Sequence, residues 1–203
     1  MYKAVLFDLD GVLTVDATGT TSIIKYFEKE IKIDKESFTK AYRKYNSDLL
    51  YGRVKHTEVW DYVCLEIGKK MDIQVLYDSF IATPIDFEML DIAKRLKANG
   101  YVVGIVTENK SDRVEYISKE HKLNEIFDVI VISDTIGSGK KEPEIFDETL
   151  RQIELGYEDC IFIDNNKENL VVPATEGMQT IYFDHDERDI ERLKEQLYSL
   201  GCK

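Results

Sequence analysis

The segment Phe7-Asp8-Leu9-Asp10-Gly11-Val12-Leu13-Thr14 completes the apolar run Ala4–Phe7 and is the most informative stretch of this chain. Two aspartates, two residues apart, follow a predicted strand, and Gly11 permits the chain to turn tightly after them. With Asp8 at the strand end and Asp10 on the loop, both side chains can reach one crevice. Paired carboxylates suit two chemical roles, a nucleophile or metal ligand and a general acid or base.

Short apolar runs recur along the chain and alternate with amphipathic helical patterns. Apolar residues repeat at helical spacing from Phe87 to Leu96, from Ile145 to Ile153 and from Ile190 to Leu200. Strands that alternate with helices predict an α/β fold with a doubly wound, Rossmann-like parallel sheet. The runs predicted as strands are Ala4–Phe7, Tyr101–Val106, Val129–Ile132, Ile161–Ile163 and Thr180–Phe183.

The interval between the first two predicted strands breaks this alternation. No strand pattern stands out between about Thr14 and Pro84. Four helical stripes take its place, beginning at Ile23, Phe38, Val59 and Ile73. We therefore expect a small helical-bundle domain inserted into an α/β core. The predicted core comprises residues 1–14 and 85–203, and the insert comprises residues 15–84.

Polar residues follow four of the predicted strands at the point where each strand ends. In an open parallel sheet, ligands bind at the carboxyl ends of the strands, so these side chains should gather there. This convergence predicts an active site at that edge. The residues are Asp8 and Asp10, Thr107, Ser133 and Asp134 with Lys140 nearby, and Asp164 with Asn165.

Composition limits the partners that this chain can have. It has 203 residues and a formal net charge of −12, and no dense run of Lys and Arg that would bind nucleic acid or a membrane surface. The first apolar run is too short for a signal peptide, and no apolar stretch approaches the roughly 18 residues of a membrane span. Three widely spaced cysteines indicate reduced thiols. We expect a cytoplasmic protein, a monomer or a small homo-oligomer.

Four segments, taken in order, resemble the motifs of the haloacid dehalogenase-like superfamily. Asp8-Leu9-Asp10-Gly11 is similar to its first motif, DxDG. Thr107 stands at the end of the second core strand, where the family has Ser or Thr, and Lys140 precedes a predicted helix as the family's lysine does. Asp164-Asn165 resembles the acidic pair after a later strand. The resemblance runs from Tyr2 to about Phe183, and the helical insert falls where the family's C1-type cap belongs.

The resemblance implies a phosphoryl-transfer site. Asp8 would attack phosphorus, and Asp10 would protonate the leaving oxygen and then activate water. Mg²⁺ would bind the Asp8 carboxylate, the Asp10 backbone carbonyl and the Asp164 carboxylate, since oxygen ligands suit this ion. Thr107 and Lys140 would hold the phosphoryl oxygens and offset charge in the transition state.

Three positions depart from the family pattern. Lys141 replaces the usual Pro, and counting back three residues from Pro143 selects Lys140 as the family's lysine. Asn165 stands where many relatives have a second Asp, so one negative charge is lost near the metal, although Asn can still orient a bound water. Glu108 follows Thr107 where many relatives have Asn. Glu108 either faces solvent or joins Thr107 and Lys140 in the phosphate-binding part of the site.

The cap would supply substrate specificity. A loop with Gly52 carries Arg53, Lys55 and His56, three cationic or titratable residues in an acidic chain. These residues either contact substrate or form an ordinary connection between two helices.

The resemblance leaves three functions open. The leading one is a Mg²⁺-dependent phosphatase acting on a small phosphorylated metabolite, with a sugar phosphate as one candidate. The first alternative is a phosphomutase similar to β-phosphoglucomutase, which differs only in passing the phosphoryl group to a sugar hydroxyl. The second is a non-catalytic binding module on the same fold, because a fold alone does not establish activity.

Overall fold

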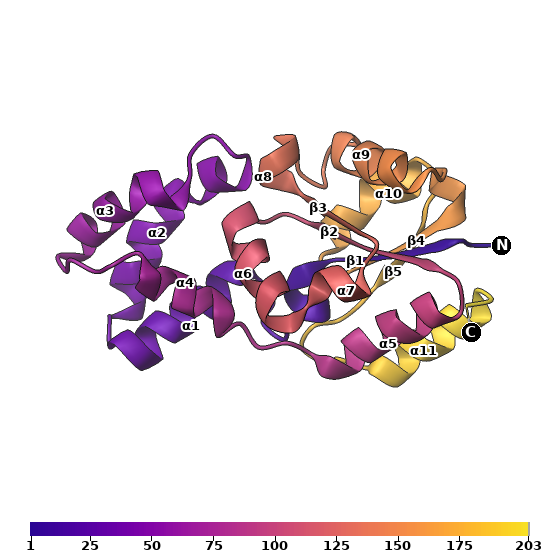
Figure 1. Ribbon diagram of the computed structural model, residues 1–203, viewed down its shortest axis with the longest axis horizontal. Coiled ribbons are helices and arrows are strands. Elements are labelled where there is room, and N and C mark those ends of the chain that lie inside the picture. Colours follow the sequence, from indigo (N-terminus) through magenta and orange to yellow (C-terminus); the bar gives the residue numbers. More distant parts are fainter. Residues whose placement is uncertain (203) are drawn as a thin grey trace.

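A single sheet of five parallel strands organises residues 1–202, which the computed structural model describes (Figure 1). The strand order is β3-β2-β1-β4-β5, so β1 lies between β2 and β4 at the centre. The predicted α/β fold class is confirmed. The strands are β1 (Ala4–Phe7), β2 (Val102–Thr107), β3 (Val129–Ile132), β4 (Cys160–Asp164) and β5 (Gln179–Tyr182).

Helices cover both faces of the sheet because alternate strand residues point to opposite sides. In β1, Val5 and Phe7 face one apolar cluster, whereas Ala4 and Leu6 face another. The first face carries α5 (Phe87–Ala98), α6 (Ser111–His121), α7 (Leu123–Ile126) and α11 (Ile190–Ser199). The second carries α9 (Glu144–Ile153), the 3-10 turn η4 (Lys167–Leu170) and the adjoining α10 (Val171–Thr175). The turns α8 (Ser133–Ile136) and η3 (Tyr157–Asp159) complete the core.

The segment between β1 and β2 forms a separate helical layer at the end of the molecule away from the termini (Figure 1). Its core is aromatic: Phe27 stacks on Phe38 with ring centroids 4.2 Å apart and lies 5.8 Å from Trp60. The division at residues 14/15 and 84/85 stays a prediction. The elements are α1 (Gly19–Tyr26), η2 (Phe27–Ile31), α2 (Lys35–Leu50), α3 (His56–Ile67) and α4 (Gln74–Ile81).

Two neighbouring linkers join this helical layer to the core. The Val15 N–H donates to the Pro84 carbonyl and the Asp86 N–H donates to the Leu13 carbonyl, both at 2.9 Å, on either side of a Thr14–Ile85 bridge. The chain therefore leaves and re-enters the core through one paired segment.

Arg188 forms hydrogen bonds with both linkers where they join the core. Its guanidinium donates to the carbonyls of Gly11 (3.1 Å), Val12 (2.9 Å) and Thr14 (3.2 Å), and to Asp86 Oδ2 from Nε and Nη2 (3.0 and 2.7 Å). Gly11 and Val12 belong to η1 (Leu9–Leu13), the turn after β1. Arg188 thus satisfies carbonyls at the end of this turn that would otherwise lack a partner.

Replacing Arg188 by Ala is expected to lower the free energy of unfolding by about 2–3 kcal/mol, because hydrogen bonds to a charged group are lost and carbonyls are left unpaired. Denaturant unfolding monitored by circular dichroism measures this loss. An Arg192→Ala variant, which changes another arginine of the same segment, should stay within about 0.5 kcal/mol of the parent. A loss for Arg188→Ala no larger than that of the control would contradict the assigned role.

No helix within residues 1–202 combines the length and the apolar character needed to cross a membrane.

Candidate active site

The carboxyl ends of β1, β2 and β4 lie at one edge of the sheet, next to the helical layer. The polar residues that follow the strands in the sequence predicted a site at this edge. Asp8 directly follows β1, Thr107 ends β2 and Asp164 ends β4. A cavity of about 740 Å³ opens at this edge. Core residues lining it include Asp8, Asp10, Thr107, Glu108, Lys140, Asn165 and Lys167, and the helical layer contributes Thr20, Arg43, Asn46 and Leu50.

Lys140 forms ion pairs with two of the predicted carboxylates. Its Nζ lies 2.7 Å from Asp8 Oδ1 and 2.7 Å from Asp164 Oδ2. Asp8 Oδ1 also accepts a hydrogen bond from the Leu9 N–H at 2.7 Å. The second oxygen of Asp8, Oδ2, has no hydrogen-bond or ion-pair partner within residues 1–202. Because Asp8 also lines the cavity, this unbonded oxygen is available to react with a bound molecule.

Asp164 is held by its own loop. Its Oδ1 accepts from the Asn166 N–H at 2.7 Å, and the buried Asn169 amide donates to both of its oxygens at 3.3 and 3.2 Å. Asn165 donates from Nδ2 to the Ala17 carbonyl at 3.1 Å, which ties this loop to the first linker. Asn169 is a supporting residue that the sequence reasoning did not single out.

Glu108 lies beside the lysine. Its Oε1 accepts a hydrogen bond from the Lys140 backbone N–H at 2.9 Å. A Cβ atom on the neighbouring Gly139 would lie 2.2 Å from that same oxygen, so a larger residue there would displace Glu108. In this arrangement the Glu108 carboxylate positions the loop of Lys140. A carboxylate is poorly suited to hold a phosphate, because both groups are negatively charged.

The buried charges of Asp8, Lys140 and Asp164 do not cancel. Two carboxylates and one ammonium leave one excess negative charge in a site where Lys140 and Asp164 are fully buried. Burial raises the pKa of Asp8 from 3.8 to about 8, since Asp164 adds to this effect and Lys140 opposes it only in part. Burial alone would lower the pKa of Lys140, but the Asp164 and Asp8 carboxylates raise it above its ordinary value.

This excess charge makes stability depend on pH. A carboxyl whose pKa is raised on folding stabilises the fold while it is protonated, and that contribution disappears as it ionises. Without divalent metal, we therefore expect the protein to lose stability relative to Asp8→Asn as the pH rises from about 4 to about 8. Melting temperatures of both proteins in EDTA, measured across this range, test the expectation. A constant difference between them would contradict it.

The donor atoms at this edge fit a hard divalent cation. Within residues 1–202, no three His, Cys, Asp or Glu side chains are grouped to hold a metal ion by themselves. Mg²⁺, however, binds commonly through one or two carboxylates and keeps several waters. Asp8 and Asp164 carry the uncompensated negative charge that such an ion would neutralise.

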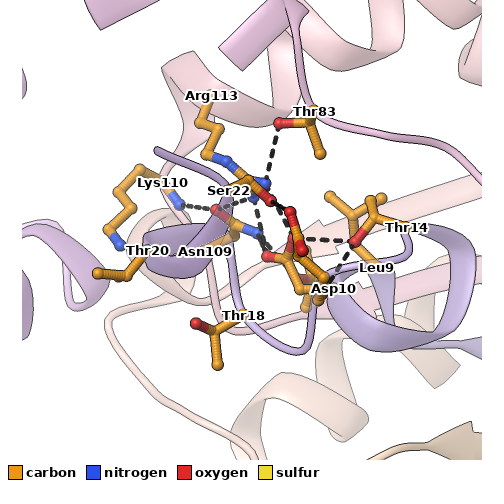
Figure 2. A network of polar contacts seen from close by, with 12 residues as sticks. Leu9, Asp10, Thr14, Thr18, Thr20, Ser22, Thr83, Asn109, Lys110 and Arg113 are labelled. Carbon is orange, nitrogen blue, oxygen red and sulfur yellow. Dashed lines mark hydrogen bonds and ion pairs between the residues drawn. The ribbon is translucent and has the colours of Figure 1, made fainter. Parts of the chain in front are cut away.

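Asp10 is held by a second network, drawn in Figure 2. Arg113, which is fully buried, forms a two-pronged ion pair with it: Nη1 to Oδ2 at 2.8 Å and Nη2 to Oδ1 at 2.9 Å. The Asn109 amide donates to Oδ2 at 2.8 Å and the Thr14 hydroxyl to Oδ1 at 3.3 Å. The carboxylate is therefore fixed by four donor groups. One comes from Thr14 of its own turn, and three come from Asn109 and Arg113, far away in the sequence.

The sequence reasoning missed Asn109 and Arg113. The one sequence feature that could have identified them is that they follow Thr107 closely. Both belong to the loop and helix that come after β2 at the predicted edge. The pair also meets the helical layer. Arg113 Nη2 donates to Thr83 Oγ1 at 3.3 Å, and a Cβ on Gly19 would lie 2.5 Å from Arg113 Nη1. The backbone at Gly19 thus approaches the ion pair too closely for any side chain.

Arg53, Lys55 and His56 lie outside the cavity lining. Arg53 is exposed and pairs with Asp48 at 3.2 Å, and Lys55 immediately precedes α3. The buried His56 ring lies between the Tyr42 hydroxyl at 2.8 Å and Asp112 Oδ2 of α6 at 2.7 Å, which joins the helical layer to the core. The structure does not bring these three residues to the cavity. Arg43 and Asn46 of α2 line the cavity instead.

A family model described as haloacid dehalogenase-like hydrolase matches residues 2–170. The chain is 27% identical over 210 residues to mouse acyl-CoA dehydrogenase family member 10, covering 95% of this chain and 19% of that protein. It is 32% identical over 90 residues to the pyrophosphatase PpaX of Bacillus thuringiensis, covering 44% and 42% respectively. The chain thus spans less than half the length of these curated relatives.

A solved structure shares the fold. It is a HAD-family enzyme from Bacteroides thetaiotaomicron, determined in complex with magnesium and inorganic phosphate. The TM-score is 0.72 at 21% identity, with 90% of this chain and 94% of the other covered.

Proposed function

Because this chain belongs to the haloacid dehalogenase-like hydrolases, we propose that it is a Mg²⁺-dependent phosphatase acting on a small phosphorylated metabolite. The observation that carries the proposal is the geometry of Asp8. Lys140 fixes one of its oxygens at 2.7 Å, and no group within residues 1–202 bonds to the other oxygen. A carboxylate held in this way is a nucleophile aimed by its neighbours.

The first step is attack of Asp8 Oδ2 on phosphorus. The bond from phosphorus to the leaving oxygen breaks, and an aspartyl-phosphate forms on Asp8. Asp10 gives its proton to the leaving oxygen, and the ammonium of Lys140 and the hydroxyl of Thr107 hold the phosphoryl oxygens. In the second step Asp10 takes a proton from water, which attacks phosphorus, releases phosphate and restores Asp8.

Asp10 must loosen its network to do this. An ionised carboxylate offers about four lone-pair sites, and four donors occupy Asp10. At least one donor has to yield before the carboxyl meets a leaving oxygen or a water, and the carboxylate has to take up a proton from solvent before it can act as the acid of the first step. The proton that Asp10 takes from water in the second step returns it to this protonated form. The Thr14 contact, at 3.3 Å, is the longest of the four.

Mg²⁺, bound by the carboxylates of Asp8 and Asp164 and the backbone carbonyl of Asp10, would neutralise the negative charge that otherwise keeps a phosphate away from Asp8. The magnesium in the Bacteroides thetaiotaomicron enzyme supports this assignment by analogy of fold. The division into a core of residues 1–14 and 85–203 and a cap of residues 15–84 belongs to the same proposal. The cap would exclude bulk water from the site.

Phosphate release from a panel of small phosphomonoesters and pyrophosphate tests the proposal. Each compound is incubated with Mg²⁺, with EDTA, and with EDTA followed by excess Mg²⁺. Release that requires Mg²⁺ and returns on its addition is expected. No release from any compound, by protein that is folded and binds Mg²⁺, would overturn the phosphatase. Conversion of a sugar phosphate to its isomer without release would favour the mutase.

A further inference from the structure

Lys110 is a buried cation without a carboxylate partner. Its side chain is only 4% exposed, yet no Asp or Glu oxygen within residues 1–202 lies within ion-pairing distance of Nζ. The ammonium donates one hydrogen bond, to Asn46 Oδ1 at 2.7 Å, and lies 5.9 Å from the centre of the Tyr42 ring. An ammonium has three donors, so this site leaves its charge and part of its hydrogen-bonding capacity unmatched.

The other buried cations of the site are paired. Arg113 forms its two-pronged contact with Asp10, and Lys140 touches both Asp8 and Asp164. Burying an unpaired charge is costly, which is why buried charges are nearly always matched by a partner or a ligand. Burial and the nearby Arg113 lower the pKa of Lys110 to about 8, although the carboxylates of Asp10, Asp112 and Asp134, none of which contacts the ammonium, oppose this shift.

Lys110 lines the cavity in company with other cations. Arg43 of α2 also lines it, is exposed, and has no ion-pair partner among residues 1–202. The acidic residues of the cavity lining are Asp8 and Asp10, which belong to the phosphoryl site, and Glu108, which is bound to the Lys140 loop. Lys110 and Arg43 are therefore two cationic groups of the cavity lining that no carboxylate within residues 1–202 contacts, in a chain whose net charge is −12.

We propose that the preferred substrate carries a second anionic group, a carboxylate or a further phosphate, which binds Lys110 and Arg43 while the reacting phosphoryl group lies against Asp8. This inference rests on the proposed phosphatase function and narrows its substrate class. The hydroxyl groups of a simple sugar phosphate cannot compensate a buried ammonium, whereas an anion compensates it and gains a charge-assisted hydrogen bond. Asn46 holds the ammonium from the helical layer, so this layer takes part in the selection.

Matched pairs of phosphomonoesters test the proposal. Glycerol 3-phosphate and 3-phosphoglycerate differ by a hydroxymethyl group against a carboxylate, and glucose 6-phosphate and glucose 1,6-bisphosphate differ by a hydroxyl against a phosphate. We expect kcat/KM to be higher for the anionic member of at least one pair by about 10- to 100-fold, the range for a hydrogen bond to a charged group. The two pairs distinguish a carboxylate from a phosphate as the second anion.

The Lys110→Met variant assigns the preference to this residue. It is expected to reduce the ratio of kcat/KM between the anionic and neutral members by about tenfold or more. Lys44→Met, which removes an exposed lysine of α2 paired with Glu66, is the matched control and should leave the ratio unchanged. An unchanged ratio in Lys110→Met would overturn the proposal even where phosphate release itself is intact.

Two further measurements separate this inference from its alternatives. If Lys110 served only to hold Asn46, Lys110→Met would lower the melting temperature of the ligand-free protein. Removal of an unmatched buried charge is instead expected to leave it unchanged or raise it. Calorimetric binding of each pair to the Asp8→Asn protein measures the preference without turnover. Equal affinities within both pairs would overturn the second-anion site, whereas failure of turnover alone would count only against the phosphatase.

Discussion

Asp8→Asn is expected to reduce phosphate release by roughly four or more orders of magnitude, because loss of a covalent nucleophile has effects of this size in other enzymes. The substitution preserves the shape of the side chain and the hydrogen bond that Leu9 N–H gives to Oδ1. It also removes one of two carboxylates that share a single ammonium, so the fold should persist. Steady-state phosphate release by the variant and its parent, at saturating Mg²⁺, measures the loss.

The control for this result is Asp91→Asn, which alters an exposed carboxylate of α5 paired with Lys94. That variant should keep the activity of the parent. Circular dichroism and the melting temperature establish that Asp8→Asn is folded before its activity is interpreted. Turnover by folded Asp8→Asn within tenfold of the parent would remove Asp8 from the role of nucleophile.

Asp10→Asn is expected to slow both chemical steps by about 10²- to 10⁴-fold, the usual contribution of a general acid or base. The leaving oxygen would lack its proton donor in the first step, and water would lack its base in the second. Asparagine cannot supply or take a proton, but it retains a carbonyl oxygen for Arg113. Substrates with good leaving groups depend less on the acid, so with them the second step should limit turnover.

A pre-steady-state experiment checks this prediction. With p-nitrophenyl phosphate, whose leaving group needs little protonation, Asp10→Asn should release nitrophenolate in a burst followed by a slow steady rate. A variant that lost activity through unfolding would show neither phase. Equal slowing for good and poor leaving groups, without a burst, would contradict a role for Asp10 in both steps.

The sequence predicted the sheet well because its strands are short, strongly apolar and bounded by polar residues. The bounds of β1 and β3 agree with prediction, and each end of the other strands moves by one residue. α9 also agrees, because Pro143 immediately precedes it and its apolar stripe is regular. The helix α6 was missed because two of the four residues on its buried face, Arg113 and Ser118, are polar and interrupt the apolar stripe.

The residues proposed to act on the phosphoryl group could be predicted from the sequence, whereas the residues that hold them in place could not. Asp8, Thr107, Lys140 and Asp164 come together because all four follow or face strand ends of one sheet edge. Arg113 and Asn169 reach the site from a helix and a 3-10 turn, where an Arg or an Asn ordinarily marks a solvated surface. Their roles depend on contacts between segments distant in sequence, and local patterns do not encode such contacts.

Local patterns predicted the cavity residues of the helical layer least well. Arg53, Lys55 and His56 drew notice as a cluster of positive charge, yet the cavity is lined by Arg43 and Asn46 from the preceding helix. A helical stripe shows which face of α2 is buried, but it does not show which end of the helix lies over the core. The orientation of the whole insert decides that, through the paired linkers at Thr14 and Ile85.

Passage of the phosphoryl group through Asp8 is tested most directly by peptide mass spectrometry after acid quenching. Parent, Asp10→Asn and Asp8→Asn proteins are mixed with Mg²⁺ and a phosphomonoester that the parent hydrolyses and that has a good leaving group, quenched at times from milliseconds onward and digested. We predict one added phosphoryl group on the peptide containing Asp8, transient in the parent, persistent in Asp10→Asn and absent from Asp8→Asn. Hydrolysis with no phosphoryl group on that peptide at any time, or with the group on another residue, would contradict the account.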